Sequence, residues 1–149
     1  MDIAICDDCF NDIQRLEELI LQHRKEQETI CFTHFFRGED LLACDHRFDI
    51  IFLDINMEGE IDGMETGQRI RDRKDNALLS FYTAYDYPAS HIVKTRPFSY
   101  LMKNSSGEDL YASLQAGKSW RCIMNCLRAE ALFLPKRVIL LIQSISSCV

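Results

Sequence analysis

The stretch DIIFLD, residues 49–54, is a run of four apolar residues between two aspartates. A short run of this composition predicts a β-strand. Similar runs recur along the chain, at IAIC (3–6), ICFTHFF (30–36), LLSFYT (78–83) and SYLMK (99–103). Amphipathic stretches separate these runs, and this alternation is typical of repeated βα units around a parallel sheet. The sequence therefore predicts an α/β fold.

The clearest predicted helix is NDIQRLEELILQHRKEQ, residues 11–27, where apolar residues recur on one face and charged residues on the other. Weaker helical segments are expected at about 38–45, 63–73, 87–95 and 107–117. Asp86 is a candidate cap for the segment that Pro88 opens. Five strands and five helices of this kind wind into an open three-layer α/β/α sandwich, and ligands bind beyond the carboxyl ends of its strands.

Length and composition bound the class of protein. The chain has 149 residues, of which 47% are hydrophobic and 27% charged, as in a globular protein with one ordinary domain. We expect a domain at 1–117 and a C-terminal extension or truncated segment at 118–149. The start, MDIAICDD, does not resemble a secretory signal, and VILLI (138–142) is too short to span a membrane. A cytoplasmic location without membrane association is the expectation.

Charge is distributed unevenly along the chain. The formal net charge is -6, yet residues 118–149 carry five Lys or Arg and one Glu, so the preceding part is strongly acidic. An acidic body argues against a nucleic-acid surface, which needs clustered positive charge. It suits a bound cation instead.

The chain has seven cysteines, an odd number, and most of them are expected to be free thiols in a reducing compartment. A redox pair at Cys6 and Cys9 is disfavoured, because Asp7 and Asp8 between them would destabilise a thiolate. A zinc site is a weaker alternative. It would use Cys6, Cys9, Cys122 and Cys126.

Polar residues at the carboxyl ends of the predicted strands share one rim of the sheet: Asp7, Asp8, Asp54, Thr83 and Lys103. Three converging carboxylates repel one another and favour a cation with oxygen ligands, such as Mg²⁺. A lysine and a hydroxyl beside them suit phosphoryl oxygens. The set predicts phosphoryl transfer, with Asp54 as the nucleophile that forms an aspartyl phosphate.

These motifs in this order, DD after the first strand, FLDIN at the third, TA after the fourth and SYLMK at the fifth, resemble the receiver domain of two-component response regulators over residues 2–117. The resemblance implies the CheY-like (flavodoxin-like) strand order 2-1-3-4-5. The stretch TAYDYP...KTRPFSYLMK further resembles the LytR/AgrA group, whose receivers usually precede a DNA-binding LytTR domain. Residues 118–149 are too few for such a domain, so we expect no direct DNA binding from this chain.

The resemblance also implies a role for each site residue. Asp54 would be the phosphoacceptor, and Lys103 and Thr83 would contact the phosphoryl group. Thr83 and Tyr100 would move together as the switch. The Mg²⁺ ligands would be Asp8 and Asp54 directly, Asp7 through water, and the main-chain carbonyl of Asn56.

A receiver of this kind accepts phosphate from a sensor histidine kinase and catalyses its own phosphorylation and dephosphorylation without acting as an enzyme on a metabolite. The expected output is transcription regulation. It would be relayed through the face of the fourth helix, fifth strand and fifth helix (86–117), which would bind a partner or a second copy. The tail is an alternative dimer surface.

Two rival functions stay open: a pseudo-receiver that is not phosphorylated, and a small aspartate-nucleophile phosphohydrolase. The hydrolase usually has a second aspartate two residues after the nucleophile, where this chain has Asn56. The chain also departs from the receiver pattern at two points. Asn104 follows Lys103 where a proline is usual, and Met57-Glu58 opens a stretch that is one residue longer than the common spacing up to Asp62-Gly63.

Overall fold

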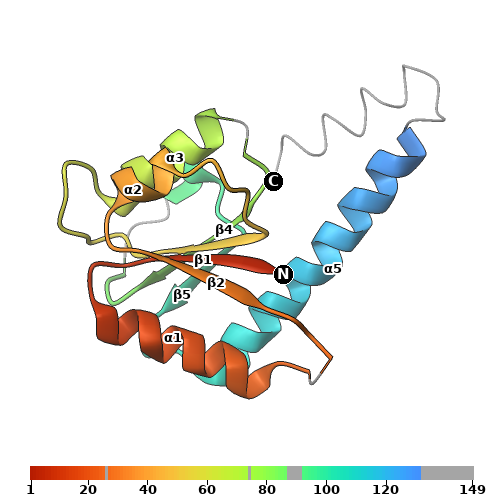
Figure 1. Cartoon of the computed structure of the whole chain (residues 1–149), viewed down its shortest axis with the longest axis horizontal. Coiled ribbons are helices and arrows are strands. Elements are labelled where there is room, and N and C mark those ends of the chain that lie inside the picture. Colours follow the sequence, from red (N-terminus) through yellow and green to blue (C-terminus); the bar gives the residue numbers. More distant parts are fainter. Residues whose placement is uncertain (26, 74, 87–91, 132–149) are drawn as a thin grey trace. The chain divides into compact units, whose positions relative to one another are not determined.

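A computed structural model of the chain describes residues 1–25, 27–73, 75–86 and 92–131 (Figure 1). Five strands form one sheet in these residues. Their bounds are β1 Asp2–Cys6, β2 Cys31–Phe35, β3 Ile50–Leu53, β4 Leu78–Thr83 and β5 Ser99–Met102. All five predicted strands are therefore present, and each of their bounds lies within one residue of the prediction.

The strand order is β2-β1-β3-β4-β5, and every neighbouring pair is parallel. The predicted parallel sheet with order 2-1-3-4-5 is confirmed. In this order β1 lies beside β3, with Cys6 opposite Leu53, and β4 lies beside β5, with Thr83 opposite Met102. The residues that follow these strands consequently leave the sheet at a common edge.

Helices cover both faces of the sheet. The helix α1 (Phe10–His23) lies on one face, and α2 (Gly38–Ala43) and α3 (Gly63–Asp72) lie on the other (Figure 1). The first turn of α5 (Gly107–Ala131) lies beside the end of α1, where the rings of His23 and Tyr111 are 5.9 Å apart. A short 3-10 helix, Val93–Thr95, precedes β5.

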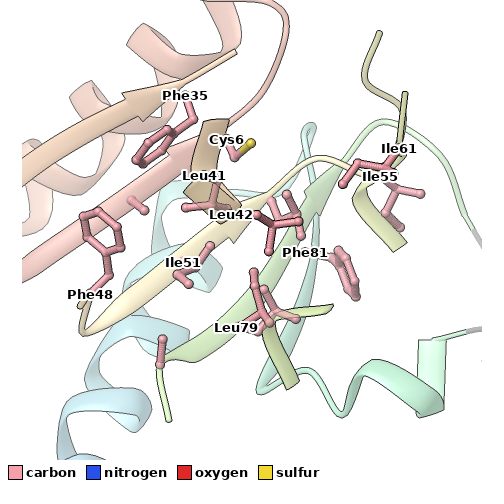
Figure 2. Close-up of a cluster of buried hydrophobic side chains, with 14 residues drawn as sticks. Cys6, Phe35, Leu41, Leu42, Phe48, Ile51, Ile55, Ile61, Leu79 and Phe81 are labelled. Carbon is pink, nitrogen blue, oxygen red and sulfur yellow. The ribbon is translucent and has the colours of Figure 1, made fainter. Parts of the chain in front are cut away.

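The buried residues of each central strand alternate between the two faces of the sheet. Ala4, Ile51, Leu53, Leu79 and Phe81 belong to the hydrophobic cluster beneath α2 and α3 (Figure 2). The residues between them point to the opposite face, which is the face that α1 covers. The central strands are thus buried on both faces, which explains why β3 and β4 are apolar almost throughout.

Two helix ends differ from the prediction. The first helix ends at His23 and not at 27, because Arg24 is already extended and no apolar residue continues the buried face. The last helix continues from Gly107 through Gly117 to Ala131, where the sequence predicted an end near 117. A single glycine inside a helix costs only about 1 kcal/mol, and no proline occurs between 118 and 131.

One other predicted helix ends earlier than expected, and some predicted segments lie outside the described residues. The helix predicted at 38–45 ends at Ala43. Most of the helix predicted at 87–95, with its proposed start at Pro88, lies outside the described residues, as does the apolar run 138–142. The chain divides into two compact units, Met1–Tyr111 and a second unit that begins at Ala112. In the part of the chain that is described, none of the helices has the length and apolar character of a membrane span.

Candidate phosphoryl-transfer site

Three carboxylates meet at the carboxyl edge of the sheet. Asp7 follows β1 and Asp54 follows β3, and the backbone N–H of Asp54 donates to the Cys6 carbonyl at 2.9 Å. One oxygen from each of Asp7, Asp8 and Asp54 lies within 4.8 Å of the others. Asp7 and Asp54 are buried, whereas Asp8 is exposed. The pairing of β1 with β3 therefore brings together the acids that the sequence placed at one rim.

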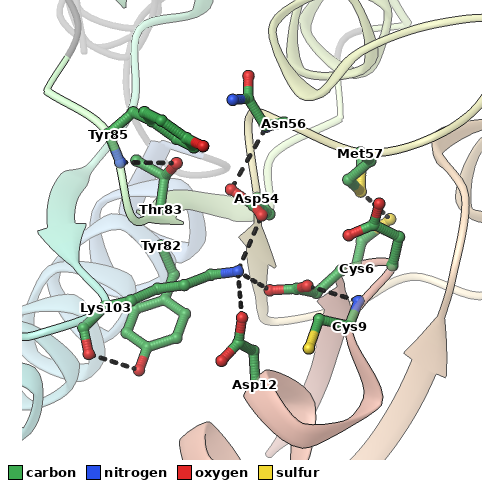
Figure 3. A network of polar contacts seen from close by, with 12 residues as sticks. Cys6, Cys9, Asp12, Asp54, Asn56, Met57, Tyr82, Thr83, Tyr85 and Lys103 are labelled. Atoms are coloured by element: carbon green, nitrogen blue, oxygen red, sulfur yellow. Dashed lines mark hydrogen bonds and ion pairs between the residues drawn. The ribbon is translucent and has the colours of Figure 1, made fainter.

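The Lys103 ammonium lies among these acids (Figure 3). Its Nζ is 2.8 Å from Asp7 Oδ2 and 2.9 Å from Asp54 Oδ2. A third carboxylate, that of Asp12 in the first turn of α1, is at 2.6 Å. The three donors of the ammonium are thus matched by three acceptors.

Main-chain contacts on both sides of Lys103 hold it in place. Its N–H donates to the Thr83 carbonyl at 2.8 Å, and the buried Tyr82 hydroxyl donates to its carbonyl at 3.4 Å. A turn follows, in which Ser105 N–H donates to the Met102 carbonyl at 2.8 Å and Met102 N–H donates to Ser105 Oγ at 3.1 Å. No cis peptide bond occurs in the described residues. The lysine consequently reaches the acids although Asn104 replaces the usual proline.

Burial and charge shift the pKa values of the groups around this lysine. Burial raises the pKa of Asp7 to about 6, against the lowering effect of its hydrogen bonds to Lys103 and the Cys9 N–H. Burial alone would lower the pKa of Lys103, but the hydrogen bonds to Asp12, Asp7 and Asp54 outweigh it and raise that pKa. The ammonium therefore stays charged and neutralises part of the acidic cluster.

Cys6 is unsuited to thiolate chemistry. Burial raises the pKa of its thiol, and the neighbouring acids raise it further. The thiol donates to the sulfur of Met57 at 3.6 Å. This environment argues against the redox pair, as the sequence predicted. Cys6, Cys9 and Cys122 are free thiols, and the Cys126 side chain, which would complete the alternative zinc set, is not among the side chains that the structure describes.

Hydrogen bonds connect Thr83 to Tyr100 through the segment after β4. Thr83 is fully buried, and its hydroxyl accepts from the Tyr85 N–H at 3.5 Å. The Tyr85 carbonyl in turn accepts from the Tyr100 hydroxyl. Tyr100 packs its ring against Phe81, with the ring centroids 6.4 Å apart. The two residues predicted to form the switch are therefore linked through the backbone of Tyr85.

Comparison with known proteins identifies the family. The sequence pattern of the response regulator receiver domain matches residues 3–115. The chain belongs to the response regulator receiver family. Receiver domains are components of two-component signalling, so this coarse part of the predicted function holds.

Relatives and solved structures agree with this assignment. An uncharacterized response regulatory protein of Vibrio cholerae is 37% identical over 65 residues, which are 44% of this chain and 24% of that protein. The response regulatory domain of protein mrkE from Klebsiella pneumoniae is 29% identical with a TM-score of 0.69, over 80% of this chain and 96% of that one. The BeF3-activated receiver domain of DrrB, a Thermotoga maritima protein, shares the fold with a TM-score of 0.66 at 21% identity, over 79% of this chain and 97% of that one. The chain thus covers about a quarter of the curated relative that it matches.

The loop between β3 and α3 of this receiver is held by carboxylates from two other elements. Asp8 Oδ2 accepts from the Glu58 N–H at 2.8 Å. Glu39 Oε1, from α2, accepts from the N–H groups of Glu60 at 2.6 Å and Ile61 at 3.0 Å. These contacts hold the loop in place between β3 and α3. Asn56 is exposed at its start, and its N–H donates to Asp54 Oδ1 at 3.4 Å.

Among the residues that contact the receiver site or its loop and that sequence reasoning missed are Asp12, Glu39 and Tyr82. A signal existed for Asp12, since it lies four residues after Asp8, in the first turn of a helix that begins at the acidic rim. Glu39 and Tyr82 carry no comparable signal. Glu39 acts across a separation of 21 residues, and Tyr82 acts on the main chain of Lys103.

Proposed function

We propose that this receiver is a phosphorylation-dependent switch that accepts a phosphoryl group on Asp54 from a sensor histidine kinase. The observation that carries the proposal is the partly buried Lys103 ammonium, 2.9 Å from Asp54 and 2.8 Å from Asp7 beside a cluster of three carboxylates. A carboxylate is ionised at neutral pH and needs no base to attack phosphorus. The bond from phosphorus to the donor then breaks, and its electron pair leaves with the donor.

The donor set fits Mg²⁺, which prefers oxygen ligands and keeps several waters. Asp7, Asp8, Asp54 and the main-chain carbonyl of Asn56 would hold it. When bound, the ion supplies positive charge to the phosphoryl oxygens. Lys103 would pair with the same group, and the Thr83 hydroxyl would donate to it after releasing the Tyr85 N–H.

The relay to an output partner would follow the connection from Thr83 through Tyr85 to Tyr100. Movement of Thr83 toward a phosphoryl group changes the Tyr85 contact and with it the Tyr100 hydroxyl contact. Such a change biases an existing two-state equilibrium of the face at 86–117. That face, or the tail, would then bind a partner or a second copy of the chain.

The finer assignments rest on sequence resemblance. We assign the receiver to the LytR/AgrA group, with transcription regulation as its output, and divide the chain into a receiver at 1–117 and an extension or truncated output segment at 118–149. We expect a cytoplasmic protein that makes no direct contact with DNA or a membrane through this chain.

The test is intact-protein mass spectrometry after incubation with acetyl phosphate, with and without Mg²⁺. We expect one Mg²⁺-dependent phosphoryl adduct on the wild type and none on Asp54→Asn, which removes the nucleophilic carboxylate at nearly constant shape. Asp45→Asn, at an exposed aspartate, is the matched control and should label normally. Equal labelling of Asp54→Asn and the wild type would exclude Asp54 as the acceptor.

Two other outcomes would point to the rival functions. Absence of an adduct on the wild type under every condition would favour the pseudo-receiver. Sustained release of phosphate from a phosphate ester would favour the phosphohydrolase, which the presence of Asn56 two residues after Asp54 disfavours.

A further inference from the structure

The Lys103 ammonium has its shortest contact with a carboxylate outside the predicted site. Asp12 Oδ2 lies 2.6 Å from Nζ, against 2.8 Å for Asp7 and 2.9 Å for Asp54. The Lys103 side chain is 13% exposed, so little water competes for its donors. A charge-assisted hydrogen bond in such surroundings is among the stronger polar contacts in a protein.

Asp12 differs from the other two partners in what else it contacts. Asp7 and Asp54 belong, with Asp8, to the group of acids whose oxygens lie within 4.8 Å of one another, and Asp12 does not. A cation bound by that group competes with the ammonium for Asp7 and Asp54. Phosphorylation of Asp54 converts its carboxylate into an acyl phosphate, so that Lys103 would face the phosphoryl oxygens in place of the carboxylate. Asp12 is therefore the carboxylate partner of Lys103, among the described residues, that remains available throughout.

The position of Asp12 is set by the fold. It lies in the first turn of α1, where its N–H donates to the Cys9 carbonyl at 3.0 Å. The next residue, Ile13, is fully buried and fixes the rotation of the helix about its axis. Asp7 Oδ1 also accepts from the Cys9 N–H at 2.9 Å. The turn that carries Asp12 is thus hydrogen-bonded to Asp7, one of the acids at the carboxyl edge of the sheet.

We propose that Asp12 is a positioning residue, which keeps the Lys103 ammonium at the site while a cation and a phosphoryl group occupy Asp7 and Asp54. The proposal rests on the proposed function, because it concerns the lysine that pairs with the phosphoryl group. A carboxylate on a fixed helix turn limits the motion of a long, flexible side chain. Phosphoryl transfer depends on such positioning.

The first test compares labelling rates with acetyl phosphate at saturating Mg²⁺. Asp12→Asn should label about tenfold more slowly than the wild type, since small displacements of a reacting group cost up to about a hundredfold. Asp12→Glu, which keeps a carboxylate at this position of the helix, should recover most of the rate. Glu18→Gln removes an equal charge from an exposed position of α1 and should label as the wild type does.

The second test measures Lys103 itself and does not need phosphorylation. Reductive methylation with formaldehyde and borohydride, followed by peptide mass spectrometry, reports how firmly the amine is held. Exposed Lys25 is the internal reference. Addition of Mg²⁺ should raise Lys103 reactivity several-fold more in Asp12→Asn than in the wild type. The variant lacks the Asp12 carboxylate, which in the wild type still binds the ammonium when the cation occupies Asp7 and Asp54.

The two tests separate this inference from the proposed function. Wild-type protein that never labels would overturn the proposed function, and methylation would still decide the role of Asp12. Normal labelling of Asp12→Asn, or a slower rate with Lys103 as protected as in the wild type, would overturn the inference. If thermal unfolding shows that Asp12→Asn does not fold, Asp12→Ser replaces it in both tests.

Discussion

At the scale of single residues, the site pairs one lysine ammonium with several carboxylates, of which those of Asp7 and Asp54 are buried. Asp7 is 2% exposed, and burial of a lone carboxylate is costly. Lys103 compensates part of that cost, since one ammonium contacts three acids. Asp8 adds a further negative charge at the exposed side of the cluster. The metal-free site therefore retains an excess of negative charge that a cation would relieve.

The burial of Asp7 predicts a pH dependence of stability in the absence of a bound cation. The pKa of Asp7 rises from its ordinary 3.8 to about 6 on folding, so the folded state binds the proton more tightly than the unfolded state. The resulting stabilisation is present below the unfolded value and is lost as pH rises through about 6. Asp7→Asn should therefore flatten the pH profile over this window and stabilise the neutral-pH protein by about 2 to 3 kcal/mol.

Urea unfolding in EDTA, at several pH values across this window, measures the effect. Asp45→Asn is the control for loss of an exposed acid and should keep the wild-type slope. An Asp7→Asn profile that parallels the wild type would contradict the assigned pKa shift.

At the scale of elements, the start of α3 determines where Asp54 lies. A Cβ added to Gly63 would come within 1.8 Å of the Asp54 carbonyl oxygen and 2.8 Å of the Ile55 Cα. The Gly63 N–H donates to the Ile55 carbonyl at 2.9 Å, and Asp62 caps the helix through the Glu65 N–H at 2.7 Å. The sequence pair Asp62-Gly63 thus serves both as a helix cap and as a close approach of two backbones.

Gly63→Ala should destabilise the protein by about 1 to 3 kcal/mol, because the obstructing atoms are backbone and have little freedom to move. The same displacement should slow acetyl phosphate labelling of Asp54. Gly67→Ala, four residues on, is the matched control. Its added Cβ would meet side-chain atoms at 3.1 Å or more, and alanine favours the helix. Denaturant unfolding should show a small change for Gly67→Ala, and an equal loss in both variants would contradict the close approach.

At the scale of the whole molecule, strand order assembles the site from distant parts of the sequence. Lys103 forms ion pairs with both Asp7 and Asp54, although it lies 96 residues after Asp7 in the chain. Parallel strands release their following residues at one edge, and the order β2-β1-β3-β4-β5 sets β1, β3 and β4 side by side in its centre. Any ligand held by these residues consequently stabilises the fold as a unit.

Mg²⁺ should therefore raise the free energy of unfolding. At ten times its dissociation constant the increase is about 1.4 kcal/mol, which corresponds to a rise in Tm of a few degrees. Thermal unfolding with MgCl2, with EDTA, and with NaCl at matched ionic strength measures it. Asp8→Asn should lose most of the increase, and a Tm that does not respond to Mg²⁺ would count against the cation site.

The sequence by itself determined the strands, their parallel arrangement and the acids at one rim, because these follow from local patterns. Apolar runs of four to six residues mark β1, β3 and β4, and each predicted site acid follows a strand or ends its run. The family resemblance then supplied the strand order. Helix ends were less predictable, as α5 shows, because the cost of Gly117 is small beside that of ending a helix without a breaker.

Only the tertiary structure decided which groups hold Lys103 and how. Asp12, Tyr82 and the turn closed by Ser105 place the ammonium without the usual proline, and Glu39 holds the loop after Asp54. Apart from the position of Asp12 in the helix turn that follows Asp8, these contacts have no sequence signature, since each joins groups that become neighbours when the chain folds. Local pattern specifies where a strand ends, but the partner of a buried charge depends on the packing of elements that lie far apart in the sequence.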